Sequence, residues 1–186
     1  MPALPYHRLT VLLAGTLLLP GLLLSQTKRD PLNDQEIDQI REVADRPPER
    51  VKLYLKFIEQ RTAAIKQMAS DPKVQNRAGK LRILMEEFTR LSDELQDNLD
   101  GYSENHSDIR KALKDLVPSS SKWTEILNLP PPDPSYDFSR KTAIEAATST
   151  ADQAKQLQDE QEKYFATHKP EKDPVNSPNT TKGESK

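Results

Sequence analysis

Hydrophobic positions divide the chain into an apolar leader and a long helical region. Leu9–Leu24 runs without a charged residue, and beyond it apolar side chains recur every three or four positions as far as Phe165. A run of about 16 residues is shorter than the roughly 20 that cross a bilayer, and Pro20 and Gly21 interrupt it. We therefore expect residues 1–25 to be an export signal, cleaved before Gln26. An uncleaved N-terminal anchor and a buried core helix are the alternatives.

The first two expected helices follow a short linker over residues 26–33. Asn33 or Asp34 suits the capping position of a helix that carries Ile37 and Ile40 on one face, and this helix should end before Pro47. The second helix is expected over residues 48–69, with Pro48 in its first turn. Its apolar positions form one broad stripe: Val51, Leu53, Tyr54, Leu55, Phe57, Ile58, Ile65 and Met68.

The third expected helix has the most regular pattern in the chain. It should cover residues 73–100, with Asp71 as cap, Pro72 at its first position and Gly101 at its end. Its stripe keeps helical spacing over three heptads: Leu81, Leu84, Phe88, Leu91, Leu95, Leu99 and Tyr102. Three heptads suffice for pairing within one chain or between chains.

Two further helices complete the pattern. One starts after Ser107 or Asp108 and is kinked or broken by Pro118 with Ser119–Ser121. It ends at Pro130–Pro134, where four of five residues are proline. The last spans residues 138–168, and we expect it to be the loosest, since many of its inward positions are small. Those positions are Ile144, Ala147, Ala151, Ala154, Leu157, Tyr164 and Phe165. Residues 169–186 form a polar, proline-containing tail that should be disordered.

Composition supports one all-α domain, a four- to five-helix bundle over residues 34–168 with antiparallel-leaning helices. The 186 residues include only five glycines and no cysteine, so neither disulfides nor cysteine-bound metals contribute. The formal net charge is −2, and acidic and basic residues alternate along the chain. No basic stripe points to nucleic acid as a partner.

Candidate chemistry is sparse. Of the three histidines, His7 lies in the leader, while His106 and His168 lie in or next to turns, and no His-Glu-x-x-His motif occurs. Glu104–Asp108 reads as a polar turn rather than a metal site. Carboxylate pairs such as Glu86–Glu87 lie beside an apolar stripe, where they are expected to be solvated. We therefore expect no catalytic residue, no cofactor and no metal, and the protein should not be an enzyme.

Aromatic residues are the candidate partner contacts. Trp123, the only tryptophan, either fills the core or anchors a partner. Tyr164 and Phe165 end the last apolar stripe, and with Trp123 they are the residues expected to contact a partner.

Three stretches resemble uncharacterised exported helical proteins of acidobacteria. They are Gln39–Ile58, Asp137–Ala147 and Glu160–Ala166. The resemblance implies a bacterial envelope location and supplies no role for any residue. Together with the leader, it predicts an extracytoplasmic protein, periplasmic or secreted, with membrane attachment only if the leader is uncleaved.

The expected function is that of a non-catalytic interaction protein: an adaptor, scaffold or chaperone-like helper that binds another envelope protein. The expected looseness of the last helix motivates this hypothesis, because it leaves apolar surface for a partner. The alternative is a small-ligand-binding or sensor-type bundle with a cavity near Tyr102 and Trp123.

Overall fold

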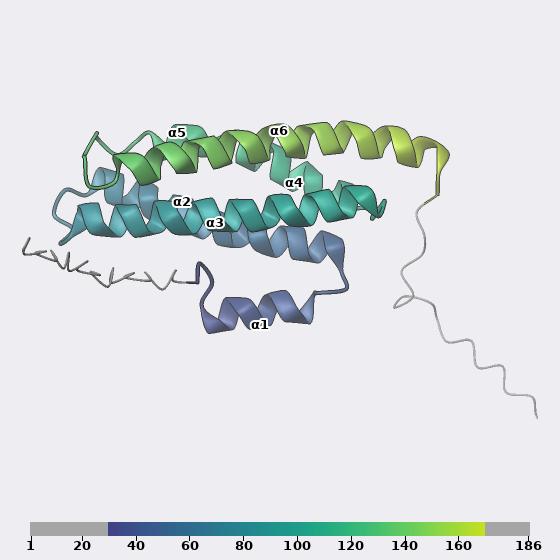
Figure 1. Ribbon diagram of the computed structural model, residues 1–186, viewed down its shortest axis with the longest axis horizontal. Helices are drawn as coiled ribbons and strands as arrows, with labels where there is room; N and C mark the ends of the chain where they lie inside the picture. Colours follow the sequence, from purple (N-terminus) through teal and green to yellow (C-terminus); the bar gives the residue numbers. More distant parts are fainter. Residues whose placement is uncertain (1–29, 170–186) are drawn as a thin grey trace, which may run out of the picture.

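The computed structural model describes residues 30–169, which are helical throughout and contain no strand (Figure 1). The elements are α1 (Asp34–Glu42), α2 (Pro47–Ser70), α3 (Arg77–Glu104), α4 (Arg110–Ser120), α5 (Trp123–Leu127) and α6 (Asp137–Thr167). The prediction of an all-α bundle is confirmed. None of these helices is both long and apolar enough to span a membrane. The predicted signal, half of the predicted linker and all but the first residue of the predicted tail lie outside the described residues.

Helix starts and stops near α1 and α2 follow the local sequence signals. The Asn33 side chain accepts a hydrogen bond from the Glu36 N–H at 3.0 Å, and the Glu36 carboxylate accepts one from the Asn33 N–H at 3.0 Å. This reciprocal pair satisfies two N–H groups that the first helical turn leaves free. Pro47 and Pro48 occupy the first turn of α2, where a missing N–H costs nothing.

The bounds of α3 were predicted four residues too early at both ends. Asp71 does not cap the helix; its carboxylate accepts the Lys73 N–H at 2.9 Å within a turn. The helix begins after Asn76, which has a left-handed backbone with φ of 52°. At the other end α3 continues through Gly101 to Glu104. Gly101 lies inside the helix and does not end it. The chain reverses at His106, whose backbone is left-handed with φ of 51°.

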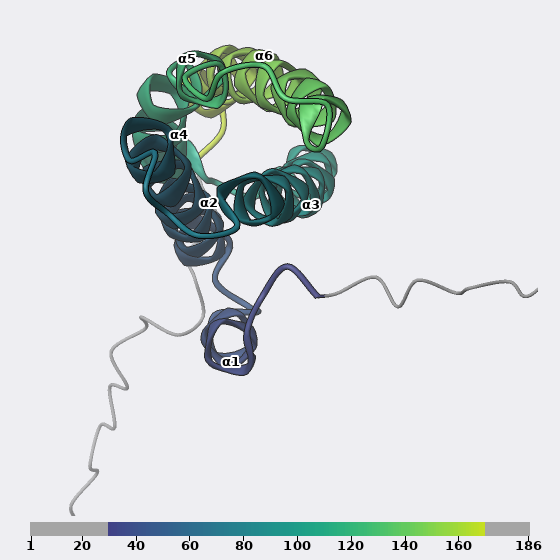
Figure 2. The ribbon, with the colours of Figure 1, turned by 90° about the vertical axis from the view of Figure 1, so that its left-hand side faces the viewer.

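Four columns form the bundle: α2, α3, α6, and α4 followed by α5 (Figure 2). Helix α4 passes through Pro118 and ends at Ser120, within the stretch Pro118–Ser121 where a kink or break was predicted. Columns that adjoin are α2 with α3, α3 with α6, α6 with α4 and α5, and these two with α2. The consecutive helices α3 and α4 therefore occupy opposite corners.

This diagonal connection makes two of the neighbouring pairs parallel. Hydrogen bonds join Ser149 of α6 to Gln96 of α3 at 2.7 Å, and Gln161 of α6 to the Ser107 carbonyl just after α3 at 2.7 Å. Residue numbers rise together along both helices, so α3 and α6 run in the same direction. Helices α2 and α4 are likewise parallel. Among the four columns, the expectation of antiparallel neighbours holds for α2 with α3 and for α4 with α6.

The core lies along the bundle axis and includes the regular stripe of α3. That stripe packs against α2 and α6, so its heptads pair within the chain. The largest fully buried side chains are Trp123, Phe57, Phe88, Ile58, Ile65, Leu81, Met85, Leu91, Leu95, Leu99, Ile109 and Leu113. Trp123 meets the Phe88 ring edge-on, with centroids 5.5 Å apart.

Helix α6 is not the loose helix that its composition suggested. It packs against α3, α4 and α5, and eight of its positions are buried: Ser139, Ala143, Ala146, Ala147, Thr150, Ala154, Leu157 and Gln161. Polar Thr150 and Gln161 take core-facing positions, whereas the predicted inward residues Ile144 and Ala151 are only half-buried. Small side chains here allow close approach to the neighbouring columns, so along its middle this helix leaves little apolar surface open; in its first turn Phe138 is exposed.

Helix α1 lies outside the four columns and is held by an ion-pair cluster. Arg61 of α2 donates to both carboxylate oxygens of Glu36, at 2.5 and 2.8 Å, and to Glu87 of α3 at 3.1 Å. It also donates to the Pro31 carbonyl at 2.8 Å. The Arg61 and Glu36 side chains are 12 % and 7 % exposed. One guanidinium thus fastens the N-terminal helix to two columns of the bundle.

Candidate functional site

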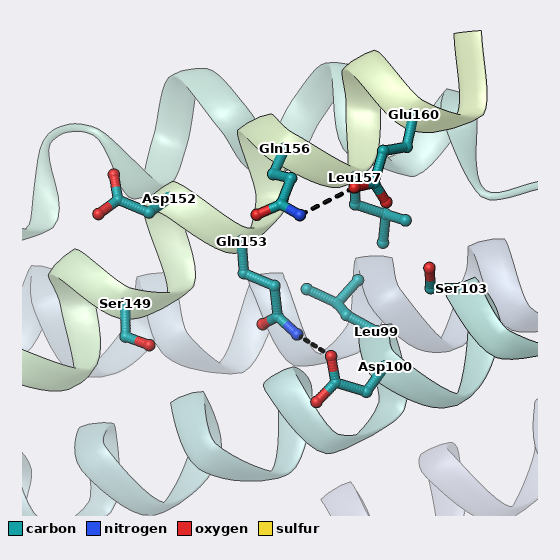
Figure 3. Close-up of a pocket in the computed structure, with 9 residues that line it drawn as sticks. All are labelled: Leu99, Asp100, Ser103, Ser149, Asp152, Gln153, Gln156, Leu157 and Glu160. Atoms are coloured by element: carbon teal, nitrogen blue, oxygen red, sulfur yellow. Dashed lines mark hydrogen bonds between the residues drawn. The ribbon is translucent and has the colours of Figure 1, made fainter. Parts of the chain in front are cut away.

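A groove lies between the C-terminal half of α3 and the middle of α6 (Figure 3). Its volume is about 360 Å³. It is lined by Leu99, Asp100, Ser103, Ser149, Asp152, Gln153, Gln156, Leu157 and Glu160. Leu99 and Leu157 face each other across the two helices but are buried in the core, so the accessible surface of the groove is mostly polar.

A second hollow of about 190 Å³ continues the groove toward the end of α6. The two share Ser103, Leu157 and Glu160, and the second adds His106, Gln161, Tyr164 and Phe165. We call the two together the α3–α6 groove. From Ser149 to Phe165 it follows α6 for about 24 Å, at 1.5 Å per helical residue.

Aromatic rings close the far end of the α3–α6 groove. The Tyr164 ring is stacked between His106 and His168, with both centroid distances 4.2 Å. Phe165 meets Tyr164 edge-on at 5.0 Å, and the Arg110 guanidinium lies 4.6 Å from the Phe165 centroid. This contact shows that the aromatic end already holds one cation at its face.

The charge of the groove is one-sided. Asp100, Asp152 and Glu160 are among its lining residues, and no lysine or arginine is. In the sequence, no lysine or arginine occurs between Arg90 and Arg110. The same stretch holds six acidic residues: Asp93, Glu94, Asp97, Asp100, Glu104 and Asp108. The groove therefore presents a negative field to any ligand.

Asp100 and the neighbouring Glu104 lie where a negative charge disfavours a helix. The last turn of α3 carries no basic residue, and Asp100 and Glu104 lie near its negative end. A carboxylate at a helix C-terminus costs about 0.3–1 kcal/mol through the helix dipole. Charge that opposes local stability is common at binding sites, where a ligand compensates for it.

Hydrogen bonds hold the groove walls in place. Gln153 of α6 donates to Asp100 at 2.6 Å and to the Gln96 carbonyl at 3.2 Å (Figure 3). Its own amide oxygen is buried and has no hydrogen-bond partner among the described residues. Gln161 accepts the Ile109 N–H at 3.0 Å and thereby ties α6 to the start of α4. The walls are thus rigid, and one acceptor in them remains unused.

Arg110 is fixed at the aromatic end by a local ion pair. It donates to the two carboxylate oxygens of Asp108 at 2.9 and 2.8 Å. The hydrogen bond from Arg110 lowers the pKa of Asp108, against the raising effect of burial. Asp108 therefore stays ionised and keeps the guanidinium over Phe165.

The structure separates the three predicted partner contacts. Tyr164 and Phe165 lie together, half-buried, at the end of the α3–α6 groove. Trp123 is 1 % exposed, which agrees with the core-filling interpretation and leaves no ring surface for a partner. Sequence reasoning missed the groove carboxylates Asp100, Asp152 and Glu160. The absence of basic residues between Arg90 and Arg110 could have pointed to Asp100, whereas Asp152 and Glu160 lie in a stretch that also contains Lys155 and Lys163 and gives no such signal.

The sequence also led us to expect no metal site and no catalytic site, and offered a ligand-binding cavity as an alternative. Within residues 30–169 no group of three or more histidine or carboxylate side chains converges as a metal site. The expectation that the protein is not an enzyme stays a prediction. For the ligand-binding alternative, the expected location is not where the hollows lie, because neither Tyr102 nor Trp123 lines the α3–α6 groove.

Comparison with known protein families, with curated proteins and with solved structures found no match to this chain.

Proposed function

We propose that this chain is a non-catalytic interaction protein of the bacterial envelope, and that its α3–α6 groove binds a positively charged segment of a partner protein. One observation carries the proposal. Three carboxylates, Asp100, Asp152 and Glu160, line the α3–α6 groove, and no lysine or arginine is among its lining residues. A cleft lined by charges of one sign attracts ligands of the opposite charge.

The chemistry of the groove indicates what the segment must contain. Lysine or arginine side chains would pair with the three carboxylates. A groove of about 24 Å accommodates about seven extended residues, at 3.3–3.6 Å each.

The aromatic end adds a second recognition element. Tyr164 and Phe165 are half-buried at the surface; His106 and His168 cover the faces of the Tyr164 ring, and Arg110 covers one face of Phe165. A cation or a large apolar side chain at the end of the bound segment would pack against these rings. Tyr164 and Phe165 thus keep the partner-contact role expected for them.

An envelope location is part of the proposal and rests on the leader Leu9–Leu24 and on the acidobacterial resemblance. Edman sequencing or mass spectrometry of the protein from fractionated cells tests it. A mature start near Gln26 supports export with cleavage. A start at Met1 in the cytosolic fraction would contradict the location and leave the groove chemistry as it is.

Binding of a labelled amphipathic lysine–leucine peptide, followed by fluorescence anisotropy, tests the groove. The variant D100N/D152N/E160Q removes the lining carboxylates at almost unchanged size. Three exposed ion pairs of about 0.5 kcal/mol each predict a roughly tenfold higher Kd. The affinity of the unaltered protein should fall as salt rises.

A matched control removes three exposed carboxylates elsewhere, as E42Q/D45N/E125Q. It changes the net charge by the same amount and should leave the Kd within twofold. Equal weakening by both variants would show that the peptide follows overall charge only. Failure of the unaltered protein to bind the peptide would contradict the proposed function outright.

A further inference from the structure

A second groove, of opposite charge, lies between the parallel helices α2 and α4 and has a volume of about 460 Å³. Four lysines and two carboxylates line it: Lys52, Lys56, Lys114, Lys122, Glu59 and Asp115. We call this surface the basic groove. All four lysines are exposed, so the groove presents a net positive charge to the solvent.

The carboxylates of the basic groove are already engaged with its walls. Glu59 accepts the Ser119 hydroxyl hydrogen bond at 2.8 Å, and Asp115 lies 3.9 Å from the Lys52 ammonium. Lys114 and Lys122 have no carboxylate within 4 Å in the part of the chain that the structure describes. Two ammonium groups therefore remain for an external anion.

The two charged grooves lie on opposite sides of the bundle. In the end-on view, α2 and α4 form one side of the ring of columns and α3 and α6 form the other (Figure 2). Each groove runs between two parallel helices. One molecule thus carries, on opposite faces, a positive surface and the negative surface that complements it.

We propose that a second copy of this chain is a partner of the α3–α6 groove, with the basic groove of one molecule docked on the α3–α6 groove of the next. This inference rests on the proposed function, since it uses the same carboxylates, and it names their partner. The long lysine side chains of α2 and α4 reach the Asp100, Asp152 and Glu160 carboxylates across the interface. A net charge of −2 leaves little overall repulsion between copies.

The geometry determines the form of the assembly. The two docking surfaces differ and face in opposite directions, so the contact is heterologous and does not close into a two-fold dimer. Head-to-tail addition then continues, and the mean mass should rise with protein concentration. An anionic membrane also attracts a lysine-rich face, but it does not account for the complementary groove on the other side of the same molecule.

Two neutralised variants test this assembly, with the protein purified as the cell produces it. One is D100N/D152N/E160Q, which keeps the basic groove. The other, K52Q/K56Q/K114Q/K122Q, keeps the α3–α6 groove. Sedimentation velocity of the unaltered protein at about 50 mM salt should give a mass that increases with concentration, and at about 1 M salt, where the screening length is roughly 3 Å, a monomer.

Mixing the variants gives the decisive result. Each variant alone should be a monomer, whereas the equimolar mixture should form a dimer and nothing larger, because only one pair of complementary surfaces remains. A monomeric unaltered protein at low salt, continued growth of either variant alone, or a mixture that stays monomeric would each overturn the inference.

The lysine–leucine peptide separates this inference from the function on which it depends. The lysine-neutralised variant should still bind the peptide with unchanged Kd, which also shows that it is folded. Peptide binding by a protein that stays monomeric would overturn self-association and leave the groove function standing. If the protein stays monomeric and binds vesicles containing phosphatidylglycerol through its lysines, self-association would be overturned. The basic groove would then be a membrane-binding surface.

Discussion

Replacement of Arg61 by methionine should release α1 from the bundle without unfolding the rest. Methionine retains the apolar stem but removes every hydrogen bond to Glu36, Glu87 and the Pro31 carbonyl. Removing one partner of a buried ion pair costs about 3–5 kcal/mol, because the remaining charge is left without compensation. Glu36, 7 % exposed in its side chain, bears most of that cost.

Undocking of α1 limits the loss, because it returns Glu36 to water. What then opposes undocking is chiefly the burial of Ile40, which is 8 % exposed and worth about 1.5–3 kcal/mol. We therefore expect the free energy that holds α1 in place to fall by about 3 kcal/mol, with the four columns intact. This corresponds to about a hundredfold increase in the local opening constant.

Hydrogen exchange read by mass spectrometry measures this local opening. Amides of Asp34–Glu42 should lose about a hundredfold protection in the Arg61→Met variant, while those of α3 keep theirs. The Arg61→Lys variant retains a positive charge but cannot bind both carboxylate oxygens of Glu36 at once. Its protection of α1 should therefore lie between those of the unaltered protein and the Arg61→Met variant. Unchanged protection of α1, or equal loss in α1 and α3, would refute the reasoning.

The pH dependence of the same contact follows from Glu36. Burial raises the pKa of Glu36, but hydrogen bonds from Arg61 and the Asn33 N–H, with the charge of Arg61, outweigh it and lower the pKa below its ordinary 4.5. The folded pKa is thus below the unfolded one, so the contribution is complete above pH 4.5 and is lost as pH falls through the folded pKa. Protection of α1, corrected for intrinsic exchange rates, should decline in that window.

Three substitutions elsewhere test the packing of the bundle, each measured by urea denaturation. Trp123→Ala should lower the free energy of unfolding by about 3–5 kcal/mol, since the ring is 1 % exposed; a loss below 1 kcal/mol would contradict its place in the core. Phe138→Ser should change it by no more than about 0.5 kcal/mol, because Phe138 is 81 % exposed, and a larger loss would reveal a contact that the fold does not contain. Gln161→Ala should cost about 1–3 kcal/mol by leaving the Ile109 N–H and the Ser107 carbonyl without partners; an unchanged stability would mean that water replaces the amide.

Local chemistry predicted the helices better than their arrangement. The capping residue Asn33, the prolines at the start of α2 and the prolines after α5 act within a few residues, so their effect is legible in sequence. The start of α3 was misjudged because Asp71 and Pro72 also suit a turn, and the turn is what forms. The periodicity of apolar residues identified the helices. It does not indicate which helices are neighbours, or whether neighbouring helices run parallel or antiparallel.

The candidate site was only partly predictable for the same reason. Tyr164 and Phe165 stood out as large residues near the end of an apolar stripe. The α3–α6 groove needs residues 99–103 and 149–160 to meet, and this depends on the diagonal connection from α3 to α4. Thr150 and Gln161 are buried although they are polar. They interrupt the apolar pattern of α6, so the sequence does not show clearly which face of this helix is buried.

Site-specific photocrosslinking in the expressing cell tests the central claim that the α3–α6 groove binds basic protein segments. A benzoylphenylalanine placed at Gln156, in the groove, and at Gln67, on the exposed surface of α2, gives a matched pair. The account predicts adducts from Gln156 only, joined to lysine- or arginine-rich segments, of this chain or of another protein. Equal adducts from both positions, or adducts from Gln156 to acidic segments, would contradict it.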